Sequence, residues 1–179
     1  MLVADLLSEL ARDIDKTCRL TGNFTLRSGQ VATEYFDKYL FESDPQLLRR
    51  VAESMVALLP EDTDLLGGLE LGGIPLATML SNLTDTPALF VRKKAKEYGT
   101  KRLAEGADVD GRTVTIVEDI ITTGGAVRDA THALRQAGAT VHTVICAIDR
   151  GPNPGEALTD VDLTTRHLLT RADLDRWRA

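Results

Sequence analysis

The sequence predicts an α/β domain in which helices flank a central, mainly parallel sheet. From about residue 60 onward, apolar runs of strand length alternate with amphipathic segments of helix length. Glycines and prolines stand at most of the boundaries between these segments. The 43% hydrophobic and 27% charged residues are typical of an ordinary globular protein, and 179 residues suit one domain. We therefore expect a single domain over residues 1–179.

The first third of the chain is predicted to form a helix, a small hairpin and a second helix. Five apolar residues recur at helical spacing at the start of the chain, namely Leu2, Leu6, Leu7, Leu10 and Ile14. Short segments at 24–27 and 35–41 read as an antiparallel pair. Asp44 before Pro45 is a typical helix start, and the helix that follows should stop by Pro60.

The rest of the chain is predicted to alternate strands and helices. We expect strands at 65–69, 88–92, 113–118, 140–149 and 163–169, and helices at 74–83, at 126–137 and in a short segment ending at Trp177. Gly138 is expected to end the helix at 126–137. Residues 93–110 break the pattern, because they are polar and long for a connection inside a domain. Such a segment is usually a functional lid or a disordered linker.

The charge and the hydropathy pattern exclude some classes of protein. The net charge of -6 disfavours nucleic acid as a partner, because duplex binding needs concentrated Lys and Arg. No apolar stretch reaches the ~20 residues of a membrane span. The acidic, amphipathic N-terminus lacks the basic start of a signal peptide. We therefore expect a cytoplasmic protein that binds neither membranes nor nucleic acid.

The most informative segment runs from Val114 to Ala126. An apolar strand ends in two acids, Glu118 and Asp119, and a Thr- and Gly-rich loop then opens a helix. The free amides and dipole of a helix N-terminus bind phosphate, and glycines let the backbone approach a ligand closely. The two acids would repel a phosphate but suit the hydroxyls of a ribose, so a ribose 5-phosphate fits both halves. The alternative is an ordinary capped turn, while dinucleotide and NTP loops have other patterns.

This segment resembles the signature by which type I phosphoribosyltransferases bind phosphoribosyl pyrophosphate (PRPP). Every position of the pattern is met. The resemblance implies the type I phosphoribosyltransferase fold, with a small N-terminal hood and a flexible catalytic loop. It also implies that Glu118 and Asp119 hold the ribose hydroxyls. The PRPP-binding residues that it implies in this segment are Glu118, Asp119, Ile120, Ile121, Thr122, Thr123, Gly124, Gly125 and Ala126.

A basic segment begins where the strand at 88–92 ends. Four cations lie within residues 92–96, which could neutralise the pyrophosphate leaving group of PRPP in a closed site. A solvated charge run is the alternative. The segment resembles the catalytic loop of orotate phosphoribosyltransferases, which implies that Arg92, Lys93, Lys96 and Tyr98 contact pyrophosphate, partly from a neighbouring subunit. The resemblance therefore implies a homodimer with shared active sites. The family often has His at position 98, and Tyr cannot carry positive charge at neutral pH.

Three further segments resemble the orotate enzymes. Arg27 stands where the family commonly has Lys, and Arg150 stands at the family's orotate-binding arginine, at the carboxyl end of a strand. Tyr35 and Phe36 could stack on a flat base, although aromatic residues in strands are more often part of a core. Thr122 completes the implied orotate-binding set. Residues 70–75 resemble the family's third PRPP loop, but with Gly72 where Lys is frequent, and a plain strand-to-helix turn is the alternative.

The resemblance implies a magnesium-dependent transfer of ribose 5-phosphate from PRPP to orotate. The products would be orotidine 5′-monophosphate and pyrophosphate, a step of pyrimidine biosynthesis. We expect Lys96 and Lys93 to stabilise charge in the transition state and Asp119 to fix the ribose, with magnesium held mainly through PRPP. Two alternatives remain, namely a purine or uracil phosphoribosyltransferase and a PRPP-sensing regulator on the same fold. Three histidines lack metal-ligand spacing, namely His132, His142 and His167.

Overall fold

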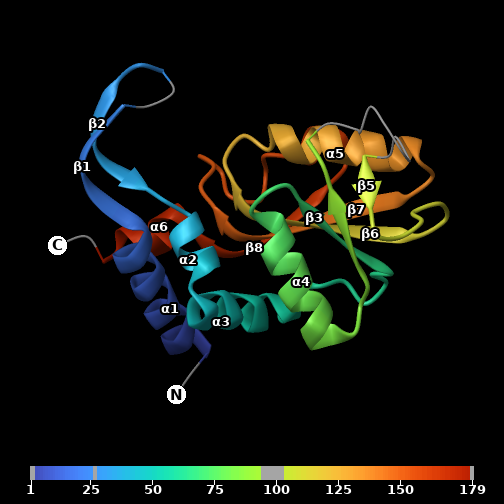
Figure 1. The fold of residues 1–179 in the computed structure, drawn as a ribbon, viewed down its shortest axis with the longest axis horizontal. Helices are drawn as coiled ribbons and strands as arrows, with labels where there is room; N and C mark the ends of the chain where they lie inside the picture. Colours follow the sequence, from blue (N-terminus) through green and yellow to red (C-terminus); the bar gives the residue numbers. More distant parts are fainter. Residues whose placement is uncertain (1–2, 26–27, 94–102, 178–179) are drawn as a thin grey trace.

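The computed structural model describes residues 3–25, 28–93 and 103–177, which form a central six-stranded sheet with helices on both faces (Figure 1). The strands are β3 (Leu65–Leu69), β4 (Ala88–Val91), β5 (Ala104–Glu105), β6 (Thr113–Ile121), β7 (Thr140–Asp149) and β8 (Thr164–Thr170), in the order β5-β4-β3-β6-β7-β8. All neighbouring pairs are parallel except β4 with β5. The predicted mainly parallel sheet is confirmed.

Helices cover the two faces of the sheet unequally (Figure 1). One face carries α1 (Val3–Cys18), α2 (Tyr39–Ser43), α3 (Pro45–Met55) and α4 (Gly73–Thr84), and the other carries α5 (Gly125–Gln136). The short helix α6 (Arg171–Asp175) follows β8 and packs beside α1. Two 3-10 turns, η1 (Val56–Leu58) and η2 (Thr159–Val161), complete the elements. The chain therefore forms three layers, with the sheet in the middle.

The core is divided in two by the sheet. On the α1–α4 side, Ile14, Phe41 and Leu76 are fully buried against sheet residues that include Val117 and Ile145. On the α5 side, a second cluster packs the helix onto the opposite face of the same strands, with members such as Val127, Leu134, Ile116 and Val144. Because both faces are buried, the central strands are apolar almost throughout, as parallel strands usually are.

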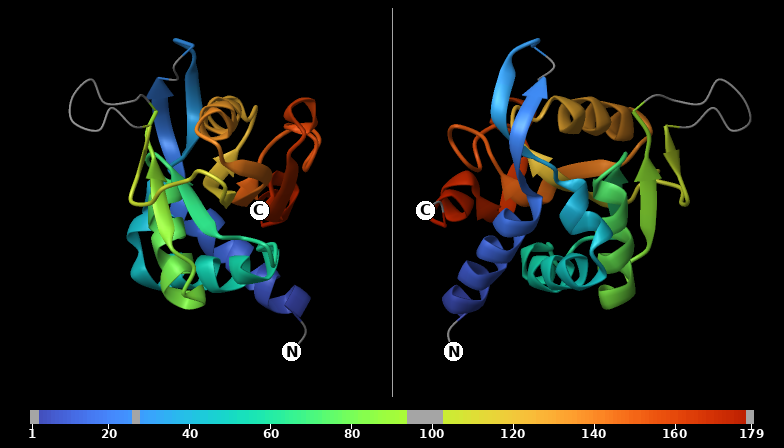
Figure 2. Two further views of the ribbon diagram at one scale, coloured as in Figure 1. Left: turned by 90° about the vertical axis from the view of Figure 1, so that its right-hand side faces the viewer. Right: turned by 60° about the vertical axis from the view of Figure 1, so that its left-hand side comes forward.

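A two-stranded hairpin stands apart from this body (Figure 2). Its strands, β1 (Arg19–Thr25) and β2 (Val31–Phe36), pair antiparallel. Isolated hairpins are marginally stable in water, so the base of this one needs support. Arg19 supplies it, because its guanidinium lies 2.6 Å from Asp15 at the end of α1, 3.1 Å from Asp175 in α6 and 3.3 Å from Glu34 in β2. The hairpin corresponds to the N-terminal hood that the sequence predicts.

Most element boundaries agree with the sequence-based prediction. The strands at 65–69 and 140–149 have the expected bounds, and Asp44 caps α3 by accepting hydrogen bonds from the amides of Gln46 and Leu47. Gly138 follows α5 with a φ of +91°, a conformation that glycine adopts readily. The caps and the apolar periodicity therefore predicted these elements from local sequence alone.

Four predictions about elements are wrong in part. The first hairpin strand, predicted at 24–27, is observed as β1 at Arg19–Thr25. The strand predicted at 113–118 extends to Ile121, because Ile120 and Ile121 continue to pair with β7. The strand predicted at 35–41 ends at Phe36, and the helix α2 then turns Phe41 into the core. The segment at 93–110 is not loop throughout, since β5 within it pairs with the edge strand β4. Residues 94–102 of that segment lie outside the described residues.

Candidate active site

The loop between β6 and α5 presents a helix N-terminus to solvent. The N-cap position is Gly124, whose φ of +73° needs glycine and which has no side chain to cap the helix. Thr122, Thr123, Gly125 and Ala126 are exposed. The amides of the first turn of α5 and the helix dipole are therefore open to an anion, as the sequence predicts.

Two contacts hold this loop in place. Arg128, one turn into α5, donates to the carbonyl oxygen of Thr123 at 2.6 Å and to the carboxylate of Asp160 at 2.9 Å. On the other side, a Cβ at Gly124 would lie only 2.6 Å from a methyl carbon of Leu158. The loop is thus fastened to the segment around η2, so the anion-binding amides keep their orientation.

The acid pair lies just before the loop, within the last residues of β6. Asp119 is completely buried. One of its carboxylate oxygens accepts a hydrogen bond from the amide of Ile120 at 2.6 Å, and the other lies 2.5 Å from the ammonium of Lys38. Glu118 is largely buried, and one of its oxygens, Oε2, has no hydrogen-bond partner in the described part of the chain. The pair therefore keeps an acceptor for a ligand.

A third acid, Glu42 of α2, adjoins the pair. Glu42 is 8% exposed, and its Oε1 is likewise without a partner among the described residues. Burial is the largest cause and the neighbouring Asp119 adds to it, so that together they raise the pKa of Glu42 to about 9 against the opposing charge of Lys38. Burial also raises the pKa of Glu118 to about 8, with the charge of Asp119 adding to the effect and Lys38 and Lys93 opposing it. Burial and the charge of Asp119 therefore favour the protonated form of both glutamates in the unliganded protein.

Lys38 is the cation inside this acidic cluster. Burial lowers the pKa of its ammonium, but the hydrogen bond and charge of Asp119 outweigh burial, so the net pKa is raised. Lys38 therefore stays charged at neutral pH and pairs with the buried carboxylate of Asp119.

The turn after β3 approaches the acids closely. A Cβ at Gly72 would collide with the carboxylate of Asp119 and would lie 2.7 Å from Oε1 of Glu42. Gly72 thus leaves room for the acidic cluster. The same turn is joined to the start of the basic segment, because Glu70 accepts a hydrogen bond from the amide of Lys93 at 3.0 Å.

A cavity of about 600 Å³ connects the basic segment with the phosphate loop. Arg92 and Lys93 line it from the end of β4, and Gly125 and Ala126 line it from the start of α5. Glu70, Asp129 and several apolar side chains complete its walls. Two predicted PRPP-binding groups that are about 30 positions apart in the sequence therefore face one space.

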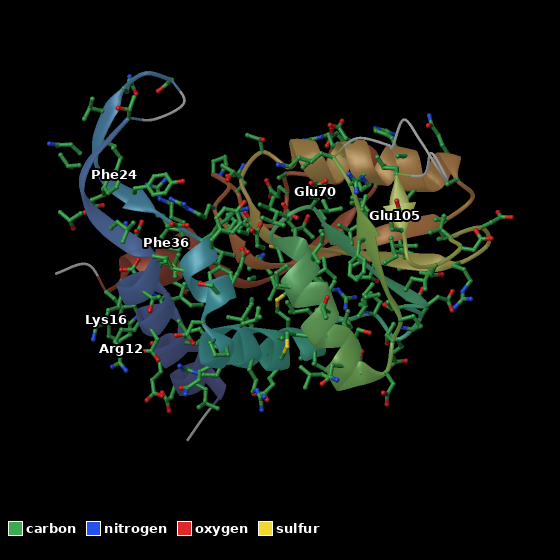
Figure 3. All side chains as sticks on the ribbon, in the orientation of Figure 1. Arg12, Lys16, Phe24, Phe36, Glu70 and Glu105 are labelled. Atoms are coloured by element: carbon green, nitrogen blue, oxygen red, sulfur yellow. The ribbon has the colours of Figure 1, made fainter. Side chains whose placement is uncertain are left out.

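The predicted orotate arginine lies on the other side of the phosphate loop. The Arg150 guanidinium is 5.0 Å from the centroid of the Phe36 ring, and its amide donates to the carbonyl oxygen of Ile121 at 2.8 Å. The buried carboxylate of Asp149 fixes the turn by accepting hydrogen bonds from the amides of Gly151 and Gly155, both at 2.8 Å. Figure 3 shows Phe36 at the base of the hairpin and Phe24 nearer its tip.

The two aromatic residues of the hairpin differ in their surroundings. Phe36 is partly buried and faces Arg150. Tyr35 is 46% exposed and packs against Phe24 within the hairpin, with ring centroids 5.5 Å apart. The structure therefore brings Phe36 together with Arg150, while Tyr35 lies on the opposite side of its strand.

Other predicted site residues cannot be placed. Arg27, Lys96 and Tyr98 lie outside the described residues. Conversely, Lys38 and Glu42 belong to the acidic cluster but were not predicted from the sequence. The sequence held one signal for a cation at this site, because two adjacent acids at the end of a buried strand need a nearby positive charge to offset theirs. Lys38 directly follows the Tyr35–Phe36–Asp37 segment that already resembled a substrate-contact region.

The fold and the phosphate loop define a class of protein, and comparison with known proteins agrees. Residues 42–164 match the family model of the phosphoribosyl transferase domain, so the chain belongs to the phosphoribosyltransferase family. Within this family it belongs to the orotate phosphoribosyltransferases. It is 71% identical over 169 residues to the orotate phosphoribosyltransferase of Nocardioides sp., covering 94% of each chain.

Solved structures give the same assignment. The orotate phosphoribosyltransferase of Mycobacterium tuberculosis has a TM-score of 0.84 and 34% identity, covering 94% of this chain and 98% of that one. Its complex with PRPP has a TM-score of 0.79 and 31% identity, with the same coverage. The predicted type I phosphoribosyltransferase fold and the predicted enzyme class are confirmed.

Proposed function

We propose that the described site carries out the reaction of the orotate phosphoribosyltransferases, with the roles given below. The bond from C1 of the PRPP ribose to pyrophosphate breaks, and pyrophosphate leaves with the bonding electrons. A bond from C1 to N1 of orotate forms, and the proton of N1 is released to solvent or to the leaving pyrophosphate. The observation that carries the proposal is the sequence of groups along β6 and α5. A buried acid pair leads directly into an exposed helix N-terminus.

The ribose and its 5-phosphate would bind to successive parts of this segment. Glu118 and Asp119 offer carboxylate oxygens to the ribose hydroxyls, and the amides and hydroxyls from Thr122 to Ala126 surround the phosphate. Ile120 and Ile121 contribute backbone to the same path. The acids precede the phosphate loop along the chain, an order that suits a ribose followed by its 5-phosphate.

The leaving pyrophosphate would be neutralised by the basic segment. Arg92 and Lys93 line the cavity that also contains the start of α5. A developing negative charge is stabilised most strongly where fixed cations face it in a space closed to water. We propose Lys96 and Tyr98 as further contacts on the strength of the family resemblance, with Lys96 and Lys93 stabilising the transition state.

Orotate would bind against Arg150 and Phe36. A guanidinium matches a carboxylate through two parallel hydrogen bonds, and a flat ring can stack on an aromatic side chain. The Arg150 guanidinium lies 5.0 Å from the centroid of the Phe36 ring, so one ligand can reach both side chains. Thr122, Tyr35 and Arg27 are further candidates. These groups favour orotate over an uncharged purine or uracil, which has no carboxylate to pair with Arg150.

Magnesium is part of the proposal. Within the described ranges, no group of three or more His, Cys, Asp and Glu side chains is arranged to hold a metal ion. Magnesium commonly keeps several waters and binds through substrate phosphates, so it can be held mainly by PRPP oxygens without a direct protein ligand. When bound it would neutralise charge on the pyrophosphate and orient it. The protein residues then hold the ribose and the base.

A homodimer in the cytoplasm is the proposed working form. If the basic segment contributes to the neighbouring active site, two damaged subunits should complement each other. We expect Lys96→Ala and Asp119→Asn to be nearly inactive alone and to recover about a quarter of wild-type turnover when mixed, because random pairing yields mixed dimers with one intact site. No recovery would contradict shared sites. Among the described helices, none is long and apolar enough to cross a membrane.

The reaction itself is tested by product analysis in both directions. The purified protein is incubated with PRPP and orotate, with and without magnesium, and orotidine 5′-monophosphate and pyrophosphate are separated by chromatography. We expect equal amounts of the two products, only with magnesium, and the return of orotate from the two products alone. Cleavage of PRPP without transfer to orotate would overturn the proposed roles.

A further inference from the structure

The acidic cluster near the turn after β3 brings several carboxyl groups close to the ammonium group of a lysine. Three carboxyl groups, those of Glu42, Glu118 and Asp119, meet in a region that is almost entirely buried. One ammonium, that of Lys38, lies 2.5 Å from Asp119 while its side chain keeps 31% exposure. Uncompensated buried charge is costly, so the ionisation of the acids depends strongly on Lys38.

The cluster joins two distant parts of the chain. Lys38 directly precedes α2, shortly after the hairpin, and Glu42 lies within α2. Glu118 and Asp119 lie near the end of β6. Asp119 is held from both sides, because Ile120 donates to one oxygen and Lys38 pairs with the other. The orientation of a proposed ribose-binding acid is therefore set by the segment that leads from the hairpin into α2.

The geometry explains why the cation comes from α2. Any side chain at position 72 would collide with the Asp119 carboxylate, and its first carbon would lie 2.7 Å from Glu42. Position 72 therefore cannot supply a cation in this arrangement. Lys38 reaches the same carboxylate from the N-terminal end of α2, with its ammonium also 5.2 Å from the centroid of the Tyr39 ring.

We propose that Lys38 is a positioning residue for PRPP, because its ammonium holds the Asp119 carboxylate in place and offsets the charge of Asp119 and Glu118 when they accept the ribose hydroxyls. This inference rests on the proposed function, since it acts through the acids assigned there to the ribose. Lys38 itself needs no contact with the reacting atoms.

Charged groups on several elements lie close enough to Glu118 and Asp119 to interact with them electrostatically. Asp119 is faced by Lys38 and Glu42 from the α2 segment and by Glu118 from its own strand. The charge of Lys93, at the end of β4, lowers the pKa of Glu118. Burial raises the pKa of the Cys146 thiol on β7, and the charges of Asp149 and of both acids raise it as well. Lys38 opposes the raised pKa of both Glu42 and Glu118, so its removal should push their ionisation to higher pH.

The test compares three variants. Lys38→Met removes the charge, Lys38→Arg keeps it, and Lys16→Met removes an exposed lysine from α1, which Figure 3 shows on the far side of the hairpin base from Glu70. The measurements are the Kd of PRPP by calorimetry, KM for each substrate, and the pH dependence of kcat/KM for PRPP. Melting temperatures establish that each variant is folded.

We expect Lys38→Met to weaken PRPP binding about tenfold or more, the effect of leaving a buried charged group without its partner. KM for orotate should change much less. The pH at which kcat/KM reaches half its plateau should rise in Lys38→Met and stay near that of the wild type in Lys38→Arg. A merely structural role would change the melting temperature without moving the pH profile. If Lys38→Met does not fold, Lys38→Gln takes its place with the same outcomes.

The inference is overturned if folded Lys38→Met matches Lys16→Met in PRPP affinity and pH profile. This outcome can be distinguished from one in which the proposed function itself fails. If the wild type and Lys16→Met consume no orotate, the proposed function fails, whereas calorimetry still reports whether Lys38 supports PRPP binding.

Discussion

The guanidinium of Arg150 lies 5.0 Å from the centroid of the Phe36 ring. The two residues are more than a hundred positions apart, and they come from the end of β7 and from the base of the hairpin. Their contact ties the hairpin to the carboxyl end of the sheet, where open α/β sheets bind ligands.

Arg150 should determine recognition of orotate. We expect Arg150→Gln to raise KM for orotate by about tenfold to a hundredfold, the worth of a hydrogen-bonded charge pair, with little change in KM for PRPP. Arg112→Gln, directly before the start of β6 and thus at the opposite edge of the sheet from Arg150, is the matched control. Steady-state kinetics with each substrate varied in turn give both constants. Equal losses for the two substrates would argue against a specific contact with orotate.

Asp149 should act through Arg150. Its two oxygens accept from the amides of Gly151 and Gly155 and so fix the turn that carries the arginine. Asp149→Asn replaces one acceptor with a donor, and we expect KM for orotate to rise several-fold, about 3- to 30-fold for one or two lost hydrogen bonds. Asp108→Asn alters a similar bond to the amide of Asp110 in an exposed loop and should be neutral. Identical kinetics of Asp149→Asn and Asp108→Asn would show that Asp149 does not position Arg150 for orotate binding.

Lys96 should act in the transition state. We expect Lys96→Ala to lower turnover by about a hundredfold, as for other groups that stabilise developing charge, while the Kd of PRPP changes little. Lys16→Ala, on α1, is the control. Single-turnover kinetics and calorimetry separate the chemical step from binding. Unchanged turnover, or a loss confined to PRPP affinity, would contradict this role.

The buried glutamates should make the unliganded protein less stable as pH rises. Glu42 and Glu118 have folded-state pKa values of about 9 and about 8, against an ordinary value of 4.5. Between these limits the folded state binds more protons than the unfolded state, so the free energy of unfolding falls by about 1.4 kcal/mol per pH unit for each group. The stabilisation that these two groups give the folded state is therefore largest below pH 4.5 and is lost as the pH rises toward 8 or 9.

Glu42→Gln isolates the contribution of one glutamate. The variant cannot ionise at position 42, so its free energy of unfolding should fall less steeply between pH 5.5 and 7.5 than that of the wild type. Urea denaturation at several pH values measures both slopes. Glu53→Gln changes an exposed glutamate on α3 and should leave the slope unaltered. Parallel curves for wild type and Glu42→Gln would contradict a protonated Glu42.

Local patterns predicted most of the fold and the central part of the site. The strand at 140–149 is apolar over nearly its whole length, and the cap at Asp44 is a local signal, so both were found. The phosphate loop could be predicted because the acids, threonines and glycines that form it are contiguous in the sequence. Arg150 was predicted from the family resemblance, with its place at the end of a strand as support.

The parts that were missed depend on contacts between distant segments. The strand β5 has two residues and exists because it pairs with β4, and β6 extends past the acids because β7 offers it partners. Lys38 shows the same limit, since its partner Asp119 is 81 positions away and no local motif surrounds it. Glu42 reads as an ordinary polar helix residue until α2 is packed onto the end of β6.

The most direct test of the central claim is a competition among bases. The purified protein is given PRPP, magnesium and either orotate, adenine, guanine, hypoxanthine or uracil, and consumption of each base is followed by its ultraviolet absorbance. We predict magnesium-dependent turnover with orotate alone, because only orotate offers a carboxylate to Arg150. Turnover of another base in preference to orotate, or PRPP binding without turnover of any base, would contradict the account.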